Sequence, residues 1–272
     1  AQGRYIMGVG PGGLISDFEM LGLTDRQARN EMMLESIETV LKLWSDGPGY
    51  RIDGKHWPIH THEAIYPHLG IGQVCRPYQQ PHPPICVSIV SPRSSTAKLA
   101  GQRGWQPISA NFIQGRYIAS HWEAYAEGCA EAGRRADPDD WRIARSVLVC
   151  DSAAQAEDYL ADPDGGLRFY YRYFIDTYKI RGVLEMLKPD PAMSDEATTE
   201  ETVARSMVTH GDAASVLDQL IAMTDEWGPF GTLVMTHHEW DDEPLWRRSM
   251  ELLATDVAPK LGQHVGTLAA AE

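Results

Sequence analysis

Short apolar runs recur along the chain, and a polar stretch with helical periodicity follows each of them. The runs cover residues 5–9, 85–90, 107–112, 141–149 and 230–235. Runs of this length are typical of buried strands, and longer stretches with apolar residues every three or four positions are typical of helices. Their alternation predicts an α/β protein with a parallel sheet, built from five strand–helix units.

Capping residues predict where several helices begin. Thr24, with Gln27 three positions later, has the pattern of a capping box at the start of a long helix that Gly47-Pro48-Gly49 ends. Ser91-Pro92 follows an apolar run and predicts a helix start at that point. Ser152 predicts another. The connections between strands and helices are therefore expected to be short.

Two architectures fit five strand–helix units. A closed (β/α)8 barrel has eight units and typically about 250 residues, whereas an open, doubly wound sheet can be built from fewer. The residue pattern alone leaves both open. In either architecture functional side chains gather at the carboxyl ends of the strands, so the expected place of a site is the same.

Segment 161–201 is the longest departure from this alternation. It carries the aromatic run 169–174, expected to pack in the core rather than line a pocket, and then a predicted helix to about Leu187. The polar, acidic stretch 188–201 follows and is predicted to be a mobile loop. We expect the whole segment to be an insertion that acts as a lid. No linker is apparent, so residues 1–272 are expected to form one domain.

Composition and charge exclude several classes of function. The chain has 24 Lys and Arg against 38 Asp and Glu, for a net charge of −14. So acidic a chain is unsuited to nucleic acid and to anionic membrane surfaces. No apolar run approaches the roughly 20 residues that span a bilayer. The four widely spaced cysteines are expected to be reduced thiols of a cytoplasmic protein.

The chain begins abruptly. Ala1-Gln2-Gly3 contains neither an initiator Met nor the basic and apolar regions of a signal peptide. The first apolar run starts at residue 5. A chain that enters a buried strand this early is expected to be the N-terminally incomplete part of a longer protein.

A glycine-rich loop follows the first apolar run. Gly8, Gly10 and Gly13 match the G-x-G-x-x-G pattern of dinucleotide-binding folds. That pattern requires a helix directly after the third glycine, whereas the predicted helix starts only at Thr24 and Pro11 lacks an amide donor. We therefore favour a turn that lets the backbone pass closely under a flat group.

The predicted helix start after residue 90 is a candidate phosphate site. Hydroxyls, free amides, a helix dipole and a guanidinium together favour a dianion. The candidate ligands are Ser91, Arg93, Ser94, Ser95 and Thr96. Arg29, in the first turn of the earlier helix, is expected to add a second guanidinium. The alternative is that Ser91 only caps its helix and the other hydroxyls face water.

Histidines gather at two places. His237 and His238, with Trp240 nearby, come directly after the last apolar run. Imidazoles titrate near neutral pH, and strand ends are where pockets form. We predict that these three residues line a substrate pocket, the alternative being solvated loop histidines. The histidines within residues 56–63 lie in a proline-rich loop without suitable ligand spacing, and no metal site is expected.

Five segments, spread over nearly the whole chain, carry a combined pattern. They are residues 3–10, 17–44, 53–57, 76–84 and 230–240. Together they resemble the bacterial luciferase-like family of flavin-dependent monooxygenases. Segment 230–240 is most similar to its limonene monooxygenase-like branch.

The resemblance implies a (β/α)8 barrel of the TIM type. The match begins at the family's fourth strand, so strands four to eight are expected here and about three units would precede residue 1. The family's usual catalytic histidine belongs to that upstream part. The catalytic residue is therefore left unassigned, with His238 as a candidate.

The resemblance also implies a flavin site. Family members bind the flavin phosphate with an Arg at the position of Arg29 and with hydroxyls and amides that match Ser91–Thr96. Gly10 is expected under the flavin ring and Asn111 beside it. Luciferases carry an Arg after the strand-four turn, where this chain has Pro11. Arg93 is expected to take over that phosphate contact.

The implied activity is that of a two-component, flavin-dependent monooxygenase. A separate flavin reductase would supply reduced FMN, and O2 would deliver one oxygen atom to a small apolar organic substrate. FAD and a deazaflavin are the alternative cofactors. Two other functions stay open, namely hydride transfer with a deazaflavin on the same fold and flavin binding without turnover. A homodimer is expected because family members commonly form one.

Overall fold

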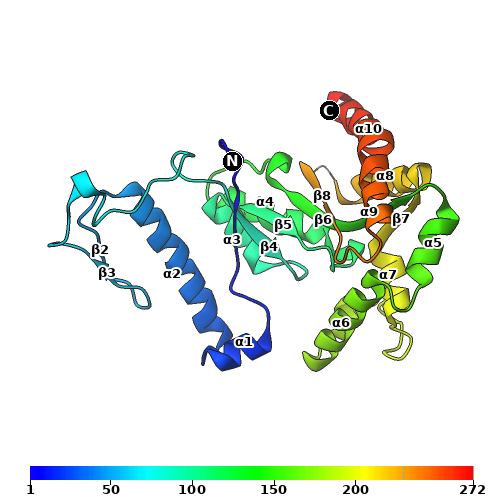
Figure 1. Ribbon diagram of the computed structural model, residues 1–272, viewed down its shortest axis with the longest axis horizontal. Helices are drawn as coiled ribbons and strands as arrows, with labels where there is room; N and C mark the ends of the chain where they lie inside the picture. Colours follow the sequence, from blue (N-terminus) through cyan, green and yellow to red (C-terminus); the bar gives the residue numbers. More distant parts are fainter. Residues whose placement is uncertain (229, 272) are drawn as a thin grey trace. The chain divides into compact units, whose positions relative to one another are not determined.

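The computed structural model describes residues 1–228 and 230–271, with side chains described through residue 265. The chain divides into two compact units, Ala1–Val87 and Ser88–Glu272. Figure 1 labels the elements of both units along the chain.

The first unit combines α-helices with short strand pairs. Its elements are β1 (Met7–Val9), α1 (Ile15–Met20), α2 (Arg26–Ser45), β2 (Arg51–Ile52), β3 (Ile59–His60), η1 (Pro67–Leu69) and the start of β4 (Ile85–Ile89). β1 pairs with β4 in parallel, as the two apolar runs predict, with Met7 opposite Ile85. β2 and β3 form an antiparallel pair that the proline-rich sequence of residues 50–84 does not predict.

The start of α2 differs by one residue from the predicted cap. Asp25, not Thr24, is the N-cap, and its side chain accepts a hydrogen bond of 2.9 Å from the Gln27 amide. The carbonyl of Thr24 instead accepts a hydrogen bond from Arg29. A carboxylate satisfies the free amides of a first turn as well as a hydroxyl does, so two adjacent candidates compete for one cap.

The second unit alternates strands and helices. Its elements are α3 (Ser95–Arg103), β5 (Gln106–Ser109), η2 (Gly115–Tyr117), α4 (Ala119–Glu131), η3 (Pro138–Asp140), β6 (Arg142–Cys150), α5 (Ala153–Ala161), α6 (Gly166–Ile180), η4 (Leu184–Met186), α7 (Glu200–Met207), β7 (Val208–Asp212), α8 (Ala213–Trp227), β8 (Thr232–Thr236), α9 (Glu243–Leu252), a π-helical turn (Leu253–Val257) and α10 (Ala258–Ala271).

β6 is the central strand of this unit. It pairs in parallel with β5, where Ser109 lies opposite Ile143, and with β8, where Ser146 lies opposite Thr236. Its carboxyl-terminal half also pairs in parallel with β7. The parallel α/β class is thereby confirmed, although the described strands do not close into a barrel.

Side chains of β6 alternate between two helical layers. Val147 and Val149 pack against Val216 and Leu220 of α8. Leu148 and Cys150 point to the other face and join a cluster formed mainly by α5, α6, α7 and α9. Successive side chains of the predicted strand 141–149 therefore point to opposite faces of the sheet, and helices cover both faces.

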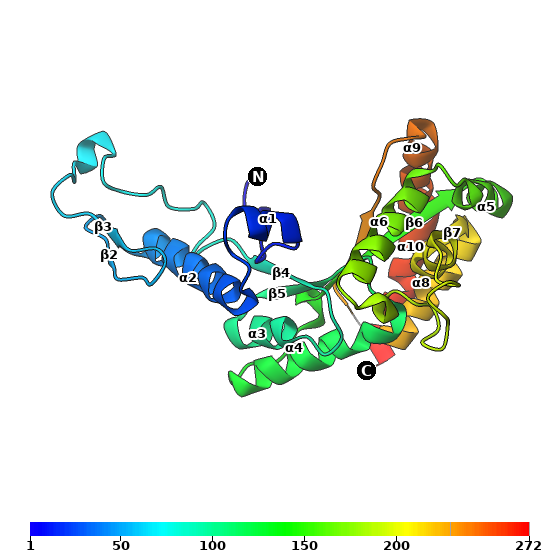
Figure 2. The same ribbon diagram turned by 90° about the horizontal axis from the view of Figure 1, so that it is seen from below.

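α3 and α4 lie side by side, as both Figure 1 and Figure 2 show. Glycines allow this close approach. A Cβ on Gly101 of α3 would overlap the carbonyl oxygen of Tyr125, and a Cβ on Gly128 of α4 would overlap that of Lys98. The two helices are thus packed backbone to backbone, and the candidate phosphate segment leads into the first of them.

The predicted start of α3 is wrong, and one strand of the second unit is not predicted. α3 begins at Ser95 with Ser94 as its N-cap, not at Ser91-Pro92, because Arg93 has a left-handed φ of 44° that interrupts the helix. β7 (Val208–Asp212) lies outside every apolar run from which a strand is predicted. Because the segment is polar, its sequence does not indicate a strand; it is a strand because its backbone pairs with that of β6.

Candidate functional site

Three polar side chains meet at the edge where β5, β6 and β8 pair. Asn111 lies two residues after β5, Ser146 belongs to β6, and His238 lies two residues after β8. The Ser146 Oγ is 3.1 Å from the His238 Nε2, and the Asn111 Nδ2 is 3.4 Å from both atoms. Parallel pairing brings these residues together from positions 127 apart in the sequence.

A fourth residue, Tyr170 of α6, completes the group. Its ring stacks on the His238 imidazole with centroids 3.5 Å apart and planes inclined by 12°. Its hydroxyl donates a 3.1 Å hydrogen bond to the Asn111 Oδ1. We refer to Asn111, Ser146, Tyr170 and His238 as the strand-end cluster.

Burial controls the protonation of the cluster. Burial, together with a smaller contribution from the neighbouring His237, lowers the pKa of His238 to about 4. Burial also raises the pKa of Tyr170. At neutral pH the cluster therefore consists of a neutral imidazole, a neutral phenol, an amide and a hydroxyl.

An aromatic wall borders the cluster. Phe112 follows Asn111, and Phe174 lies one helical turn after Tyr170. These two rings stack with centroids 4.3 Å apart, and Phe174 also contacts Tyr170 at 4.8 Å. The polar groups of the cluster are therefore set beside apolar surface, which suits a largely apolar ligand.

His237 and Trp240, the other predicted pocket residues of the loop after β8, lie next to aromatic side chains. The His237 ring lies 5.0 Å from Trp240 and 5.3 Å from Trp246. Trp240 remains 46% exposed. Of the three predicted substrate-pocket residues, His238 thus joins the strand-end cluster, whereas His237 and Trp240 contact each other.

Asp241 fastens this loop to α6. Its carboxylate accepts hydrogen bonds from the Tyr159 hydroxyl at 2.8 Å, from the Gly166 amide at 2.8 Å and from the Trp246 indole at 3.3 Å. Gly166 is the first residue of α6. One carboxylate therefore joins the loop that carries His238 to the helix that carries Tyr170.

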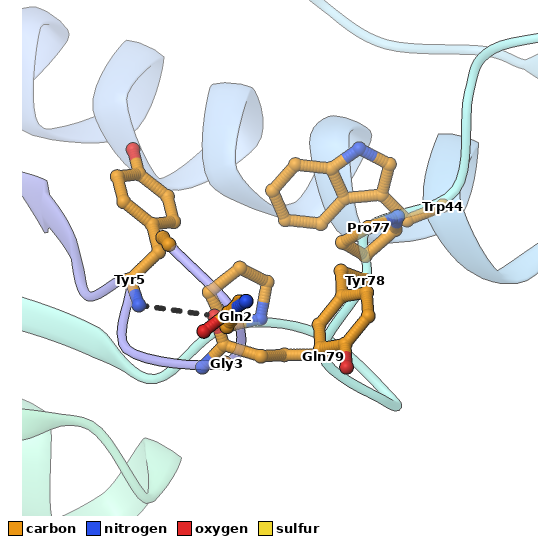
Figure 3. Close-up of a pocket in the computed structure, with 9 residues that line it drawn as sticks. Gln2, Gly3, Tyr5, Trp44, Pro77, Tyr78 and Gln79 are labelled. Atoms are coloured by element: carbon orange, nitrogen blue, oxygen red, sulfur yellow. Dashed lines mark hydrogen bonds between the residues drawn. The ribbon is translucent and has the colours of Figure 1, made fainter.

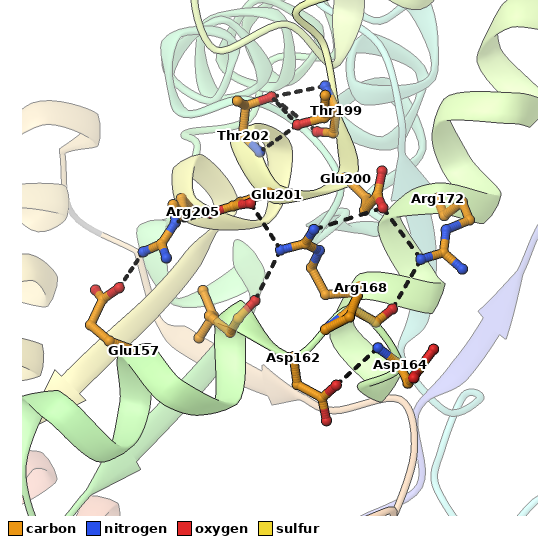
Figure 4. Close-up of polar contacts among 12 residues, drawn as sticks. Glu157, Asp162, Asp164, Arg168, Arg172, Thr199, Glu200, Glu201, Thr202 and Arg205 are labelled. Carbon is orange, nitrogen blue, oxygen red and sulfur yellow. Dashed lines mark hydrogen bonds and ion pairs between the residues drawn. The ribbon is translucent and has the colours of Figure 1, made fainter.

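Ion pairs also join α6 to α7. Arg168, only 7% exposed, lies between Glu200 at 3.7 Å and Glu201 at 3.3 Å, both in the first turn of α7 (Figure 4). Arg172 contacts Glu200 and the carbonyl of Pro163. The predicted lid segment thus includes a helix tied to α7 and to the strand-end cluster, and its role as a lid stays a prediction.

The candidate phosphate segment lies at the start of α3. The buried Ser94 accepts a hydrogen bond from the Thr96 amide at 3.2 Å, and the Arg93 amide donates to Ser120 at 3.0 Å. No hydrogen bond or ion pair within the described chain involves the side chains of Ser91, Arg93, Ser95 and Thr96. Free hydroxyls and a guanidinium at the N-terminus of a nine-residue helix fit a phosphate group.

Two other predicted flavin contacts belong to the first unit. The Arg29 Nη1 donates hydrogen bonds to the carbonyls of Leu23 at 2.6 Å and Thr24 at 2.9 Å. Its guanidinium lies 3.6 Å from the centre of the Phe18 ring. These contacts anchor the turn between α1 and α2. Open space surrounds Gly10, where an added Cβ would have no atom within 4 Å. The roles of both residues with a flavin stay predictions.

The first unit also contains an aromatic pocket of about 390 Å³ (Figure 3). Tyr5, Trp44 and Tyr78 are among its lining residues, and the Tyr5 amide donates to the Gln79 side chain across it. None of the predicted site residues lines this pocket. Without a cluster of titratable groups it offers hydrophobic contact but no evident catalysis.

Sequence reasoning missed Ser146, Tyr170 and Asp241. A signal for Ser146 exists, because a hydroxyl interrupts the apolar run 141–149. Tyr170 belongs to an aromatic run predicted as core, and its neighbour Tyr171 is indeed fully buried. Nothing local to Asp241 indicates that its partners come from residues 159 and 166.

Comparisons with known proteins agree with the family resemblance of the sequence. The profile of the family described as "Luciferase-like monooxygenase" matches residues 1–229. The chain is 26% identical to 3,6-diketocamphane 1,6-monooxygenase of Pseudomonas putida, over 96% of this chain and 72% of that protein. It is 26% identical to limonene 1,2-monooxygenase of Rhodococcus erythropolis, over 98% of this chain and 63% of that protein.

A solved structure shares the fold. The oxygenating constituent of 3,6-diketocamphane monooxygenase from Pseudomonas putida, a type II Baeyer–Villiger monooxygenase in complex with FMN, superposes with a TM-score of 0.80 at 26% identity. The match covers 95% of this chain and 71% of that one. The chain thus spans about two thirds of the length of the relatives that it matches. No helix in the described part of the chain is long and apolar enough to cross a membrane.

Proposed function

The chain belongs to the luciferase-like monooxygenase family, and we propose that it serves in a flavin-dependent monooxygenase that oxygenates a small, largely apolar organic substrate. Its TIM-barrel-type α/β fold, the match to named monooxygenases and the complex of one relative with FMN support this proposal. The structural observation that carries it is the start of α3, where free hydroxyls and a guanidinium fit the phosphate of FMN.

The residues of the α3 start would hold the cofactor. Ser95 and Thr96 offer hydroxyls in the first turn of the helix, and Arg93 offers a charged donor just before it. Arg29 and Gly10 are further proposed contacts, with the phosphate and the flavin ring respectively. When bound, reduced FMN would supply the activation of O2. We propose that a separate flavin reductase provides it in reduced form and that the enzyme is a homodimer.

The strand-end cluster would bind and orient the substrate. Its neutral imidazole and amide offer hydrogen bonds without net charge, and Phe112 and Phe174 offer apolar contact. The stacked Tyr170 covers one face of the imidazole and limits the access of water to it.

Cofactor binding and oxygen use test the proposal together. The chain should quench the fluorescence of FMN on titration, and FMN should bind more tightly than riboflavin because only FMN carries the phosphate. With a flavin reductase and NADH, a bound substrate should increase O2 uptake with one oxygen atom recovered in the product. Binding of a deazaflavin without O2 uptake would instead support hydride transfer. Flavin binding without any turnover would support a non-catalytic relative.

A further inference from the structure

Arg93 adopts a backbone conformation that is unusual for its residue type. Pro92 and Arg93 lie in the turn that leads from β4 into α3, and the φ of Arg93 is 44°, in the left-handed region. A residue with a Cβ is strained there, and glycine is the ordinary residue at such a position. Strain of this kind persists only where neighbouring groups hold it, and it concentrates at binding sites.

The hydroxyl of Ser120, in the first turn of α4, holds this conformation. The Arg93 amide donates to the Ser120 Oγ at 3.0 Å, and the Ser120 hydroxyl in turn donates to the carbonyl of Tyr117. Both directions are certain, because a backbone amide only donates and a carbonyl only accepts. The bond fixes the direction of the Arg93 N–H, and with it the peptide plane from which the φ of Arg93 is measured. Ser120 therefore stabilises the left-handed conformation.

The next residue of α4, His121, makes this support rigid. The imidazole is fully buried, and its Nδ1 lies 2.8 Å from the Ser109 Oγ, to which the Trp141 indole donates at 3.0 Å. The imidazole also contacts the backbone of Ser91. Two consecutive residues of α4 thus contact the segment before α3, one at Ser91 and the other at Arg93.

The start of α3 is held by the same helix. α3 and α4 lie side by side (Figure 2), and their backbones meet at Gly101 and Gly128. Within the described chain, the amides of Ser94 and Ser95 donate to no acceptor, so both stay available to an anion. The free amides and the strained residue before them are therefore fixed to one support.

We infer that Ser120 is a positioning residue for the proposed phosphate site, because it holds Arg93 in the conformation that keeps this guanidinium at the start of α3 before the ligand arrives. This inference rests on the proposed function only for the identity of the ligand, the phosphate of FMN. Ser120 acts through Arg93, since its own proton is already donated to Tyr117. The strain at Arg93 is the cost of a site that is ordered in the free protein.

The support is measured first, on the full chain without flavin. In amide hydrogen exchange followed by NMR, the Arg93 amide should be protected in wild type and exchange at least tenfold faster in Ser120→Ala. Ser120→Thr retains an acceptor hydroxyl and should keep the protection within about threefold. An Arg93 amide that is unprotected in wild type, or equally protected in Ser120→Ala, would overturn the inference.

Binding is then measured by fluorescence titration with FMN and with riboflavin. Ser120→Ala should weaken FMN binding about fivefold, the equivalent of one hydrogen bond, and leave the binding of riboflavin, which has no phosphate, unchanged. Ser120→Thr should bind FMN within twofold of wild type. Ser152→Ala is the matched control, because the Ser152 hydroxyl also accepts one backbone amide, that of Gln155 at 3.2 Å. It should lower stability without changing FMN affinity.

Variants of Arg93 test the path from Ser120 to the ligand. Arg93→Gly and Arg93→Ala both lose the guanidinium and should weaken FMN binding about tenfold. Arg93→Ala should unfold at a lower urea concentration than Arg93→Gly, because only glycine adopts this φ without strain. Equal midpoints would contradict the strained conformation.

In the Arg93→Gly background, Ser120→Ala should change FMN affinity by less than twofold, because the group that it positions is gone. A fivefold loss in both backgrounds would show that Ser120 acts without Arg93 and would refute the inference. Wild-type protein that binds FMN no more tightly than riboflavin would refute the phosphate site, and the inference with it. A wild-type preference for FMN that Ser120→Ala leaves intact would refute the inference alone.

Discussion

At the residue scale, Asn111 and His238 were each selectable from the sequence, but for different reasons. Asn111 could be selected because of the resemblance to the luciferase-like family, and His238 because it is a histidine directly after a predicted strand. The sequence could not bring them together because their distance depends on the pairing of β5 and β8 with β6, a long-range property. Tyr170 joins the strand-end cluster only because α6 passes beside it in the fold. The identities of site residues were thus partly predictable, whereas their hydrogen bonds were not.

Tyr170→Phe tests the polar part of the strand-end cluster. The substitution keeps the ring stacked on His238 but leaves the buried Asn111 Oδ1 without its donor. We expect the free energy of unfolding, measured in urea, to fall by about 1.5 kcal/mol. Tyr173→Phe on the same helix is the control, since the Tyr173 side chain is 45% exposed. Equal losses in the two variants would argue against the hydrogen bond.

Ser95→Asp tests the proposed phosphate site with opposite effects on folding and binding. A carboxylate in the first turn of α3 interacts favourably with the helix dipole, so stability should stay constant or rise by about 0.5 kcal/mol. The same charge should repel a phosphate and weaken FMN binding about tenfold or more. Riboflavin, which lacks the phosphate, should bind as it does to wild type. Unchanged FMN affinity in fluorescence titrations would remove the α3 start from the site.

At the element scale, apolar runs predict β1, β4, β5, β6 and β8, because each strand falls within or beside a continuous apolar run, although β1 and β8 are only partly buried. β7 and the β2–β3 pair escape the same reasoning, since their residues are polar and their pairing is made by the backbone. Helix starts are displaced where two capping residues compete, as at Asp25, or where a left-handed residue precedes the helix, as Arg93 does before Ser94. Periodicity therefore identifies elements, while tertiary pairing decides short strands and exact ends.

Asp241→Asn tests the connection between the β8 loop and α6. Burial opposes ionisation of this carboxyl, but hydrogen bonds from the Gly166 amide, Tyr159 and Trp246 outweigh it and hold the pKa of Asp241 below its usual value. An asparagine has one acceptor oxygen and presents an NH2 group to one of these donors. We expect a loss of about 1–2 kcal/mol in the free energy of unfolding.

The same variant should affect the strand-end cluster. Loosening the loop from α6 should broaden the imidazole signals of His238 in NMR spectra of protein labelled with ¹⁵N-histidine, because the stack on Tyr170 is no longer held. Asp164→Asn, in the exposed turn before α6, is the control and should change stability by less than about 0.5 kcal/mol. An Asp241→Asn variant as stable as wild type would show that the aromatic contacts alone hold the loop.

At the scale of the whole molecule, the resemblance to the luciferase-like family is confirmed, and so is the TIM-barrel-type α/β fold. The choice between a barrel and an open sheet could not be made from five strand–helix units. It follows from the relatives, because local patterns carry no information on how a sheet closes. The division into two compact units was likewise not visible in the sequence, since no linker composition marks residue 87.

Stability of the whole molecule should depend on two histidines that are neutral at pH 7, the buried His121 and the half-buried His238. Burial lowers the pKa of His121 to about 4, with the Arg145 charge adding to this and a contact with the Ser91 backbone opposing it. The pKa of His238 is also about 4. Below about pH 6.5 the unfolded chain binds protons that the folded chain does not. Stability therefore falls as pH decreases from 6.5 toward 4.

Urea unfolding at pH 7 and pH 5 measures this effect. Each histidine should account for a loss on the order of 2 kcal/mol between the two pH values. His121→Asn and His238→Asn should each reduce the difference by about that amount, and the double variant by the sum. Single variants with the full wild-type difference would place the pH sensitivity in other groups.

The carboxylate of Asp241 has a consequence for how the substrate range of the proposed substrate site can change. By fastening the β8 loop and the start of α6 to each other, it makes the two walls around His238 a single body. Neither wall can recede alone to admit a bulkier molecule. Diversification of such an enzyme is then confined to trimming or enlarging side chains such as Phe112 and Phe174, while the length of the loop stays constant.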